Sequence, residues 1–411
     1  MQSVTPIQRA PAKTNPQTSE RTTTSVRMFQ FVPEVGYREY WYPALLARSV
    51  GRRPKKVVML GEELVFFRGA SGKIVALWDR CPHRGALLSF GRCQFKGTIS
   101  CPYHGYTYDE TGMCVAAITE GPDSGHVGKL RARTFPTQEV RGIVFVWMGE
   151  TEPVPVQEDM PEELISDDWF INSYIDDWPM NWALTVENTA DAHFSYVHRF
   201  SFRRFLNLEN FRYLPAYWAG IKIVEEGKNY IGIKPDSKVP QQAYYPGVKA
   251  KWPRQVWWRV LKPQLGRPHA KGKDYHLEYR LPSIISVDYV NRIHMRWPVP
   301  IDKQTTRMFT FALYPARTPW QRLLARLHFW TIHWFFVIKG TNENEDVPVQ
   351  QRDRLDPHAP QKLGRNDRAI IYWRRRMPWK SRDAERLWPK PGSGVTPETE
   401  KQDDDQKALT K

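Results

Sequence analysis

Two short loops in the first third of the chain each place a cysteine close to a histidine. The first loop reads CPHRG from Cys81, the second reads CPYHG from Cys101, and seventeen residues (84–100) separate His83 from Cys101. A mixed-ligand [2Fe–2S] cluster takes two cysteines on one iron and two histidines on the other, so the spacing predicts an electron-transfer cluster. Its four ligands would be Cys81, His83, Cys101 and His104.

A structural zinc site is the alternative, because zinc also accepts two cysteines and two histidines. Zinc modules usually pair cysteine with cysteine and histidine with histidine along the chain. Here the two residue types alternate, and each loop carries the Pro and Gly that suit a tight turn. The order of the ligands therefore favours the iron–sulfur cluster.

The segment from Trp78 to Asp109, WDRCPHRGALLSFGRCQFKGTISCPYHGYTYD, resembles the Rieske domain of the aromatic ring-hydroxylating oxygenases, the Rieske non-haem iron oxygenase family. That family comprises terminal oxygenase alpha subunits, including demethylase and monooxygenase branches. Respiratory Rieske proteins carry a disulfide between their cluster loops, whereas the corresponding residues here are Ala86 and Tyr103. The resemblance implies a lower reduction potential than theirs, because the groups around the sulfurs tune it.

A second metal site is predicted in residues 187–198, which read ENTADAHFSYVH. Two histidines plus a distant carboxylate form the facial triad of non-haem iron(II) oxygenases. The family motif runs Glu-Asn, Asp, His and His, and its members usually place two residues between the Asp and the first His, where this chain has one. The resemblance implies iron binding by both histidines and an active-site role for the Asp and Asn. The matching residues are Glu187, Asn188, Asp191, His193 and His198.

The helix geometry of this motif predicts an irregularity. Asp191 and His198 share a helix face, whereas His193 and His198 lie about 140° apart at 3.6 residues per turn. We therefore expect a broken or π-bulged helix, which is common at functional sites. The resemblance places the third iron ligand within residues 342–351, at Asp346, with Glu345 as the alternative.

The resemblance also implies a head-to-tail homotrimer in which the cluster of one subunit faces the iron of its neighbour. Asp191 would then link the cluster ligand His104 to the iron ligand His193 of the next subunit. A carboxylate in such a position orients the imidazoles and tunes the metal.

The elements that position these residues fall into two domains. Short apolar runs broken by Gly-containing turns predict a small all-β Rieske domain over residues 37–152, with strands at 56–60, 63–67, 74–78 and 143–147. A Pro- and acid-rich stretch, 151–163, reads as a linker. Mixed helical and strand patterns follow, which predict an α+β catalytic domain over 153–388 with an antiparallel sheet flanked by helices.

Within the second domain the alternating segments predict strands, and two longer segments predict helices. Polar tails are expected at 1–36 and 389–411, where the composition is typical of disorder. The predicted helices are 180–198 at the start and 320–340 later, and 363–377 resembles the terminal helix of the family. The predicted strands are 256–260, 275–281, 284–290, 292–297 and 308–314.

The composition limits the remaining possibilities. The chain has 411 residues, 41% of them hydrophobic, with 17 Trp, which is enough for large buried cores. No segment reaches the roughly 20 apolar residues of a membrane span. The longest apolar run, 327–338, predicts a buried helix, with an exposed lip near an apolar substrate or a membrane surface as the alternative. Cys93 and Cys114 show no pairing pattern, which favours a reduced, cytoplasmic protein over one with a disulfide between them.

The net charge of +16 includes eight Lys or Arg within residues 249–273. Such a run is typical of a solvated loop, and the alternative is a docking patch for an acidic redox partner. No nucleic-acid-binding module accompanies the charge.

Together these features predict a terminal oxygenase that transfers electrons through the cluster to the mononuclear iron and uses O₂ to hydroxylate or demethylate an apolar, aromatic or polycyclic molecule. The resemblance implies a ferredoxin, an NAD(P)H-dependent reductase, or both, as electron donors. The alternative is a pure electron carrier with a non-catalytic second domain.

Overall fold

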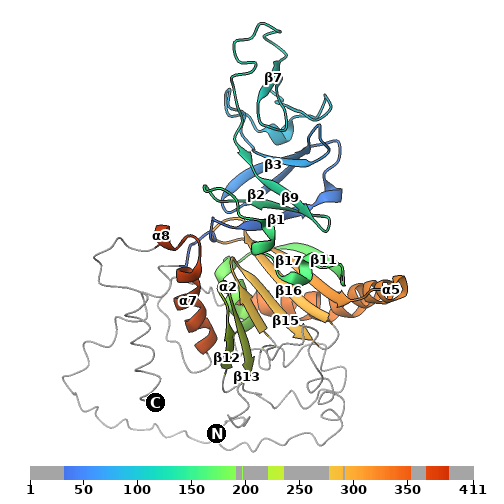
Figure 1. Ribbon diagram of the computed structural model, residues 1–411, viewed down its shortest axis with the longest axis vertical. Coiled ribbons are helices and arrows are strands. Elements are labelled where there is room, and N and C mark those ends of the chain that lie inside the picture. The colour runs from blue at the N-terminus through green and yellow to red at the C-terminus, as the bar shows by residue number, and fades with distance from the viewer. Residues whose placement is uncertain are drawn as a thin grey trace, which may run out of the picture.

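The computed structural model describes residues 32–190, 197, 221–235, 277–289, 292–352 and 367–387. Its described part comprises two domains, and Figure 1 shows the first standing on the second, with β7 toward the far end. The predicted tails and basic run lie outside the described residues, except for residues 32–36. In this part of the chain no helix is long and apolar enough to cross a membrane.

The first domain is all-β and consists of three small antiparallel sheets. Their strand orders are β1-β10-β9, β2-β3-β4-β8 and β5-β6-β7. The first cysteine–histidine loop follows β4 of the second sheet, and the second loop joins β5 to β6 of the third sheet. The strands are β1 (Trp41–Leu46), β2 (Lys55–Met59), β3 (Glu62–Arg68), β4 (Ile74–Trp78), β5 (Ile99–Ser100), β6 (Tyr106–Tyr108), β7 (Cys114–Ala117), β8 (Thr134–Phe135), β9 (Thr137–Val140) and β10 (Ile143–Trp147), with 3₁₀ turns η2 (Ala47–Ser49) and η3 (Leu88–Phe90).

The second domain is built on a seven-stranded antiparallel sheet of order β11-β17-β16-β15-β14-β13-β12. Its strands are β11 (Trp169–Trp178), β12 (Ile221–Glu226), β13 (Tyr230–Pro235), β14 (Leu277–Arg280), β15 (Ile284–Tyr289), β16 (Arg292–Pro300) and β17 (Thr306–Pro315). The helices are η4 (Val156–Glu158), α1 (Glu162–Ile165), α2 (Trp182–Ala190), α5 (Pro319–His328), η8 (Phe329–Asp346), α6 (Val347–Arg352), α7 (Arg368–Lys380) and α8 (Ala384–Leu387).

This architecture confirms the predicted fold class of an all-β domain followed by an α+β domain. Among the described residues, every predicted strand matches a strand of the structure to within a few residues, and the predicted strand at 256–260 lies outside them. The predicted long helix is α5 followed by η8, which is a π-helix rather than a continuous α-helix. A π-helix is rare and is found mostly at functional sites.

The prediction of a linker at residues 151–163 is wrong in one respect, because this segment is packed against the rest of the protein. Residues 151–163 contain η4 and the start of α1, and Val156 and Met160 are buried. The buried carboxylate of Asp159 accepts a hydrogen bond from the backbone N–H of Trp41 at 2.9 Å and pairs with Arg382. Asp159 therefore links β1 to the segment between α7 and α8.

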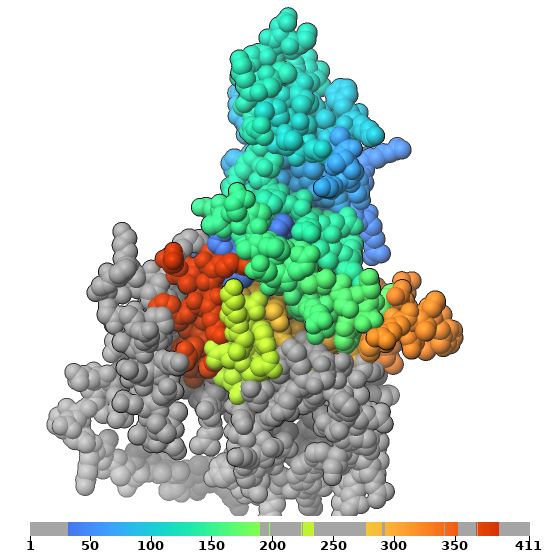
Figure 2. Space-filling model, viewed as in Figure 1, coloured from blue at the N-terminus to red at the C-terminus, as the bar shows by residue number. Residues whose placement is uncertain are grey.

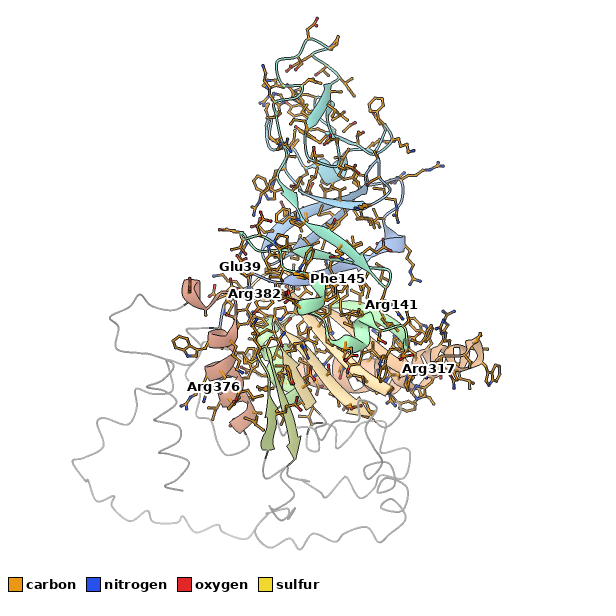
Figure 3. All side chains as sticks on the ribbon, in the orientation of Figure 1. Glu39, Arg141, Phe145, Arg317, Arg376 and Arg382 are labelled. Carbon is orange, nitrogen blue, oxygen red and sulfur yellow. The ribbon has the colours of Figure 1, made fainter. Side chains whose placement is uncertain are left out.

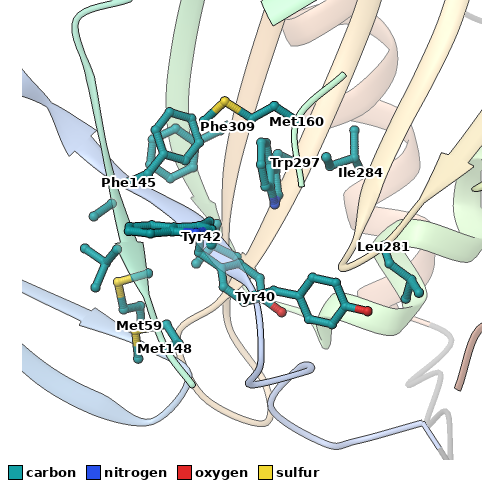
Figure 4. Close-up of a cluster of buried hydrophobic side chains, with 14 of the residues drawn as sticks. Tyr40, Tyr42, Met59, Phe145, Met148, Met160, Leu281, Ile284, Trp297 and Phe309 are labelled. Carbon is teal, nitrogen blue, oxygen red and sulfur yellow. The ribbon is translucent and has the colours of Figure 1, made fainter. Parts of the chain in front are cut away.

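The two domains share one hydrophobic core, so the first domain cannot pivot freely on the second. Phe145 of β10 packs against Trp297 of β16 with ring centroids 5.5 Å apart, and the Leu60 N–H donates to the Pro300 carbonyl at 2.7 Å. Figure 4 shows this core. Figure 3 places Arg382 and Glu39 together at the same junction, where the guanidinium of Arg382 donates to the Glu39 carbonyl at 2.7 Å.

Candidate metal centres

The two cysteine–histidine loops have the same backbone hydrogen-bond pattern. In the first loop the Cys81 N–H donates to the Ala86 carbonyl at 2.8 Å, and the Gly85 N–H donates to the Cys81 carbonyl at 2.7 Å. In the second loop, Cys101 and Gly105 repeat both bonds, at 2.8 and 3.2 Å, with Tyr106 in the place of Ala86. Both glycines have positive φ, 75° and 70°, which residues with a Cβ rarely adopt. The sequence similarity of the loops therefore has a direct structural counterpart.

The four predicted cluster ligands lie together at the end of this domain. Cys81 and Cys101 are buried, while His83 and His104 are partly exposed. The two imidazole rings are 4.8 Å apart at their centroids, with an interplanar angle of 74°. Two imidazoles bound to one tetrahedral ion through metal–nitrogen bonds of about 2.0–2.1 Å would have centroids about 5 Å apart. The residues present therefore fit a cluster with a buried sulfur-ligated iron and an outer imidazole-ligated iron.

The two thiols interact with each other and with one hydroxyl. The hydrogen bond from the Cys101 thiol is the largest cause that lowers the pKa of Cys81, to about 6, and the same contact raises the pKa of Cys101. The Tyr108 hydroxyl lies 3.1 Å from the Cys81 sulfur. This hydroxyl was not among the predicted site residues, although it belongs to the strand that follows the second loop.

Tyr108→Phe should lower the reduction potential of the cluster. The hydroxyl is positioned to donate a hydrogen bond to the Cys81 sulfur, and such a bond stabilises the reduced, more negative state. A net value of about 0.5–1.5 kcal/mol for one hydrogen bond corresponds to about 20–60 mV for a one-electron couple. Protein-film voltammetry of both proteins measures the difference. Tyr103→Phe, at an exposed tyrosine of the second loop, is the control, and an unchanged potential in Tyr108→Phe would contradict the assignment.

Helix α2 leads into the predicted iron motif and is fixed at both ends. The Asn181 side chain accepts from the Ala183 N–H at 2.8 Å, which caps the first turn, and donates to the Lys303 carbonyl at 2.9 Å. Farther along, the carboxylate of Glu187 forms two hydrogen bonds of 2.6 Å with the guanidinium of Arg374 on α7. Both side chains are buried, so this pair ties α2 to α7 from within the domain.

The structure brings the end of α2 and the end of the π-helix η8 to one buried cation. The Arg296 guanidinium on β16 approaches the Asn188 side-chain oxygen at 3.4 Å. Burial lowers the pKa of Arg296, and the charge of Asp346 acts in the opposite direction and raises it. Asp346 is itself 5% exposed. The remaining predicted residues of the motif lie outside the described residues; they are Asp191, His193 and His198.

A buried pair of histidines joins the same strand to η8, and it was not among the predicted site residues. His294, on β16, has its Nδ1 3.0 Å from the Nε2 of His333 in η8, and the Arg292 guanidinium donates to the His333 Nδ1 at 3.1 Å. Arginine cannot accept, so a neutral His333 carries its proton on Nε2 and donates to His294. Burial is the first cause that holds the pKa of both imidazoles well below the ordinary value. No sequence signal joins these residues, because they are 39 positions apart.

These histidines predict that stability falls in acid. Their folded-state pKa values are depressed, so below about pH 6.5 the unfolded chain binds protons that the folded chain does not. Each imidazole then removes up to about 1.4 kcal/mol of unfolding free energy per pH unit. The double variant His294→Gln/His333→Gln should be less stable at pH 7.5 but lose less stability between pH 6.5 and 5. Urea unfolding at each pH measures both slopes, and equal slopes would refute the role of this pair.

The sequence matches two protein-family models. Residues 40–136 match the family model described as Rieske [2Fe-2S] domain, and residues 147–329 match the one described as homotrimeric ring hydroxylase. The carbazole 1,9a-dioxygenase terminal oxygenase component of Metapseudomonas resinovorans is 28% identical over 83% of this chain and 90% of that protein. The phenoxybenzoate dioxygenase subunit alpha of Ectopseudomonas oleovorans is 34% identical over 43% of this chain and 46% of its own length.

Solved structures show the same arrangement of the two domains. The terminal oxygenase of carbazole 1,9a-dioxygenase from Novosphingobium sp. KA1 superimposes with a TM-score of 0.70 at 25% identity, covering 88% of this chain and 98% of that one. A reduced complex between oxygenase and ferredoxin in carbazole 1,9a-dioxygenase gives a TM-score of 0.70 at 24% identity, covering 89% and 95%. The fold thus defines a two-domain terminal oxygenase, with a cluster-binding domain followed by a ring-hydroxylase domain.

The chain belongs to the Rieske non-haem iron oxygenases. It is an oxidoreductase whose cofactors are a Rieske [2Fe–2S] cluster and a non-haem iron, with O₂ as co-substrate and electrons supplied through a reductase. The match of the second domain to ring hydroxylases supports the oxygenase over the pure electron carrier.

Proposed function

We propose that Cys81, His83, Cys101 and His104 hold the Rieske cluster of this oxygenase. The observation that carries the assignment is the repeated loop geometry, in which two buried sulfurs and two outward imidazoles converge. Tyr108 donates a hydrogen bond to the Cys81 sulfur in this proposal and so adjusts how readily the cluster accepts an electron. The domain boundaries are proposed as 37–152 for the cluster domain and 153–388 for the catalytic domain.

The mononuclear iron is assigned to His193, His198 and Asp346, on the resemblance of their segments to the family motif. Burial supports Asp346 over Glu345, because the Asp346 side chain is inside the domain and the Glu345 side chain is partly exposed. Arg296 supports it as well, since a buried cation keeps a nearby carboxylate ionised and able to bind a metal.

The reaction proposed is oxygenation of an apolar aromatic or polycyclic molecule, by hydroxylation or by oxidative demethylation. Relatives named for carbazole, phenoxybenzoate and chlorobenzoate support the aromatic class. When bound, the two metal centres supply electron transfer and O₂ activation. The protein fixes the positions around them: the Glu187–Arg374 pair holds α2, and Arg296 orients the Asn188 side chain at its end.

The electron donors proposed are a ferredoxin, an NAD(P)H-dependent reductase, or both, and the assembly proposed is a homotrimer. Solved structures of oxygenase–ferredoxin complexes and the homotrimeric family model support both statements. Asp191 would link His104 of one subunit to His193 of the next. We assign the protein to the cytoplasm, where reduced thiols persist, because Cys93 and Cys114, the two cysteines outside the proposed cluster, form no disulfide.

Metal analysis and a coupled assay test this function. An oxygenase retains the two irons of the cluster plus one mononuclear iron per chain, whereas an electron carrier retains only the cluster. Aromatic acids, methoxyarenes and sterol-like compounds would be screened for NADH consumption with a surrogate ferredoxin and reductase. A third iron and a hydroxylated or demethylated product support the proposal. A fully loaded protein without the third iron, and without product from any compound class, would contradict it.

A further inference from the structure

Helix α5 and the first residues of η8 expose a continuous line of large apolar side chains. Within the described residues, these side chains are between 46% and 66% exposed, which is unusual for Trp and Leu placed at helical spacing. Figure 2 shows the segment, in orange, projecting from the side of the catalytic domain. We call it the apolar ridge, and it consists of Trp320, Leu323, Leu324, Leu327 and Trp330.

The ridge is the outer face of the helix, and the inner face packs against the sheet of the catalytic domain. Ala325 and Phe329, on the opposite side, are buried in a cluster with Ala312 and Tyr314 of β17. Thr318 caps the helix by accepting from the Gln321 N–H, so the helix begins at a defined position. Since one apolar face suffices to attach the helix to the sheet, the second apolar face has no role within the described domain.

The charged side chains of α5 itself are all basic. Residues 303–342 contain six Lys or Arg and no Asp or Glu. Arg317, beside the start of the helix, pairs with Asp168 at 3.1 Å, whereas Arg322 and Arg326 on the helix are exposed. A helix with Trp and Leu on one face and Arg beside it binds in the plane of an anionic lipid surface. Arginine side chains reach from such a helix toward the lipid headgroups.

The low apolar content of this helix limits how it can meet a membrane. The helix continues into η8, and in the described part of the chain no helix combines the length and apolar content that a membrane span needs. It can therefore lie on a bilayer but not cross it. A second copy of this chain is the competing occupant. A symmetric ridge-to-ridge contact is repulsive because both ridges carry the same arginines, whereas a head-to-tail contact within the proposed homotrimer would place the ridge against a different face, and the light-scattering experiment below separates that case from membrane binding.

We propose that the apolar ridge docks this oxygenase on the surface of an anionic lipid membrane. Apolar side chains enter the headgroup boundary and the flanking arginines contact acidic headgroups. Binding of this kind weakens with salt because the electrostatic part is screened.

Vesicle flotation of the full-length, cluster-loaded protein tests the proposal. The wild type should float with vesicles of phosphatidylcholine mixed with phosphatidylglycerol, less with phosphatidylcholine alone, and less at high sodium chloride. The variant Leu323→Gln/Leu324→Gln/Leu327→Gln should bind at least about tenfold more weakly, because it loses three side chains that enter the bilayer. Arg322→Gln/Arg326→Gln should lose mainly the preference for phosphatidylglycerol.

The control removes exposed apolar side chains from other elements. Val115→Gln/Val349→Gln should float like the wild type, and the visible spectrum of each variant reports that the cluster domain is intact. Absence of flotation by the wild type, or equal flotation of the triple-Gln variant, would overturn the proposal. So would light scattering that shows the wild type as an oligomer and the triple-Gln variant as a smaller species, because the ridge would then be a subunit interface.

Discussion

His198→Ala should abolish turnover while the visible spectrum of the cluster remains that of the wild type. The two metal centres are held by different domains, and His198 is assigned to the second. Changes to groups that merely support a metal ligand already cost about 10–100-fold in metal affinity or activity, so removal of a ligand should cost more than about 100-fold. The iron content per chain should fall by one atom. Single-turnover product formation and metal analysis on the same sample measure both effects.

The complementary change separates the two centres. Cys101→Ser should bleach the visible spectrum and stop electron transfer, because the serine hydroxyl replaces a thiolate ligand. Cys93→Ser is its control: this free cysteine lies outside the two loops, and its replacement should leave the spectrum unchanged. If turnover survived in His198→Ala, the assignment of the mononuclear iron would be wrong even if the cluster assignment held.

The local parts of the molecule were predictable from the sequence because short-range rules determine them. Each cluster loop closes through bonds between residues four or five positions apart, with a glycine of positive φ, and these features are visible in the order Cys, Pro, His, Gly. The alternating strands of the second domain were predictable for the same reason, since the side-chain period of a strand is two.

The long-range parts were not predictable, because no periodicity connects their members. Arg296 comes from the middle of a strand, where it looks like one of many surface arginines, and only the fold buries it beside Asn188 and Asp346. The packing of residues 151–163 was missed because their Pro and acidic content is typical of a linker. Asp159 is nevertheless buried, and the partner that explains it, Arg382, lies 223 positions away.

The buried pair between Glu187 and Arg374 has one predictable and one unpredictable member. The sequence identified Glu187 as part of a motif but did not identify its partner. Arg374→Met should lower the unfolding free energy of the catalytic domain by about 3–5 kcal/mol, because the Glu187 carboxylate stays buried without its two guanidinium bonds. This corresponds to a fall in Tm of about 6–20 °C for a domain of this size. Since α2 leads into the ligand segment, retention of the mononuclear iron should fall as well, while the cluster spectrum persists.

Two comparisons show whether burial of the ion pair causes the loss of unfolding free energy in Arg374→Met. Arg307 and Asp177 form a bidentate pair of similar geometry, at 2.9 and 3.0 Å, but the Asp177 side chain is 47% exposed. Arg307→Met should therefore cost no more than about 1 kcal/mol. The double variant Glu187→Met/Arg374→Met should recover most of the stability that Arg374→Met loses, because an apolar pair leaves no buried charge. Calorimetric unfolding of the four proteins distinguishes the cases. Equal losses in Arg307→Met and Arg374→Met would show that the inner pair contributes no more than a surface contact.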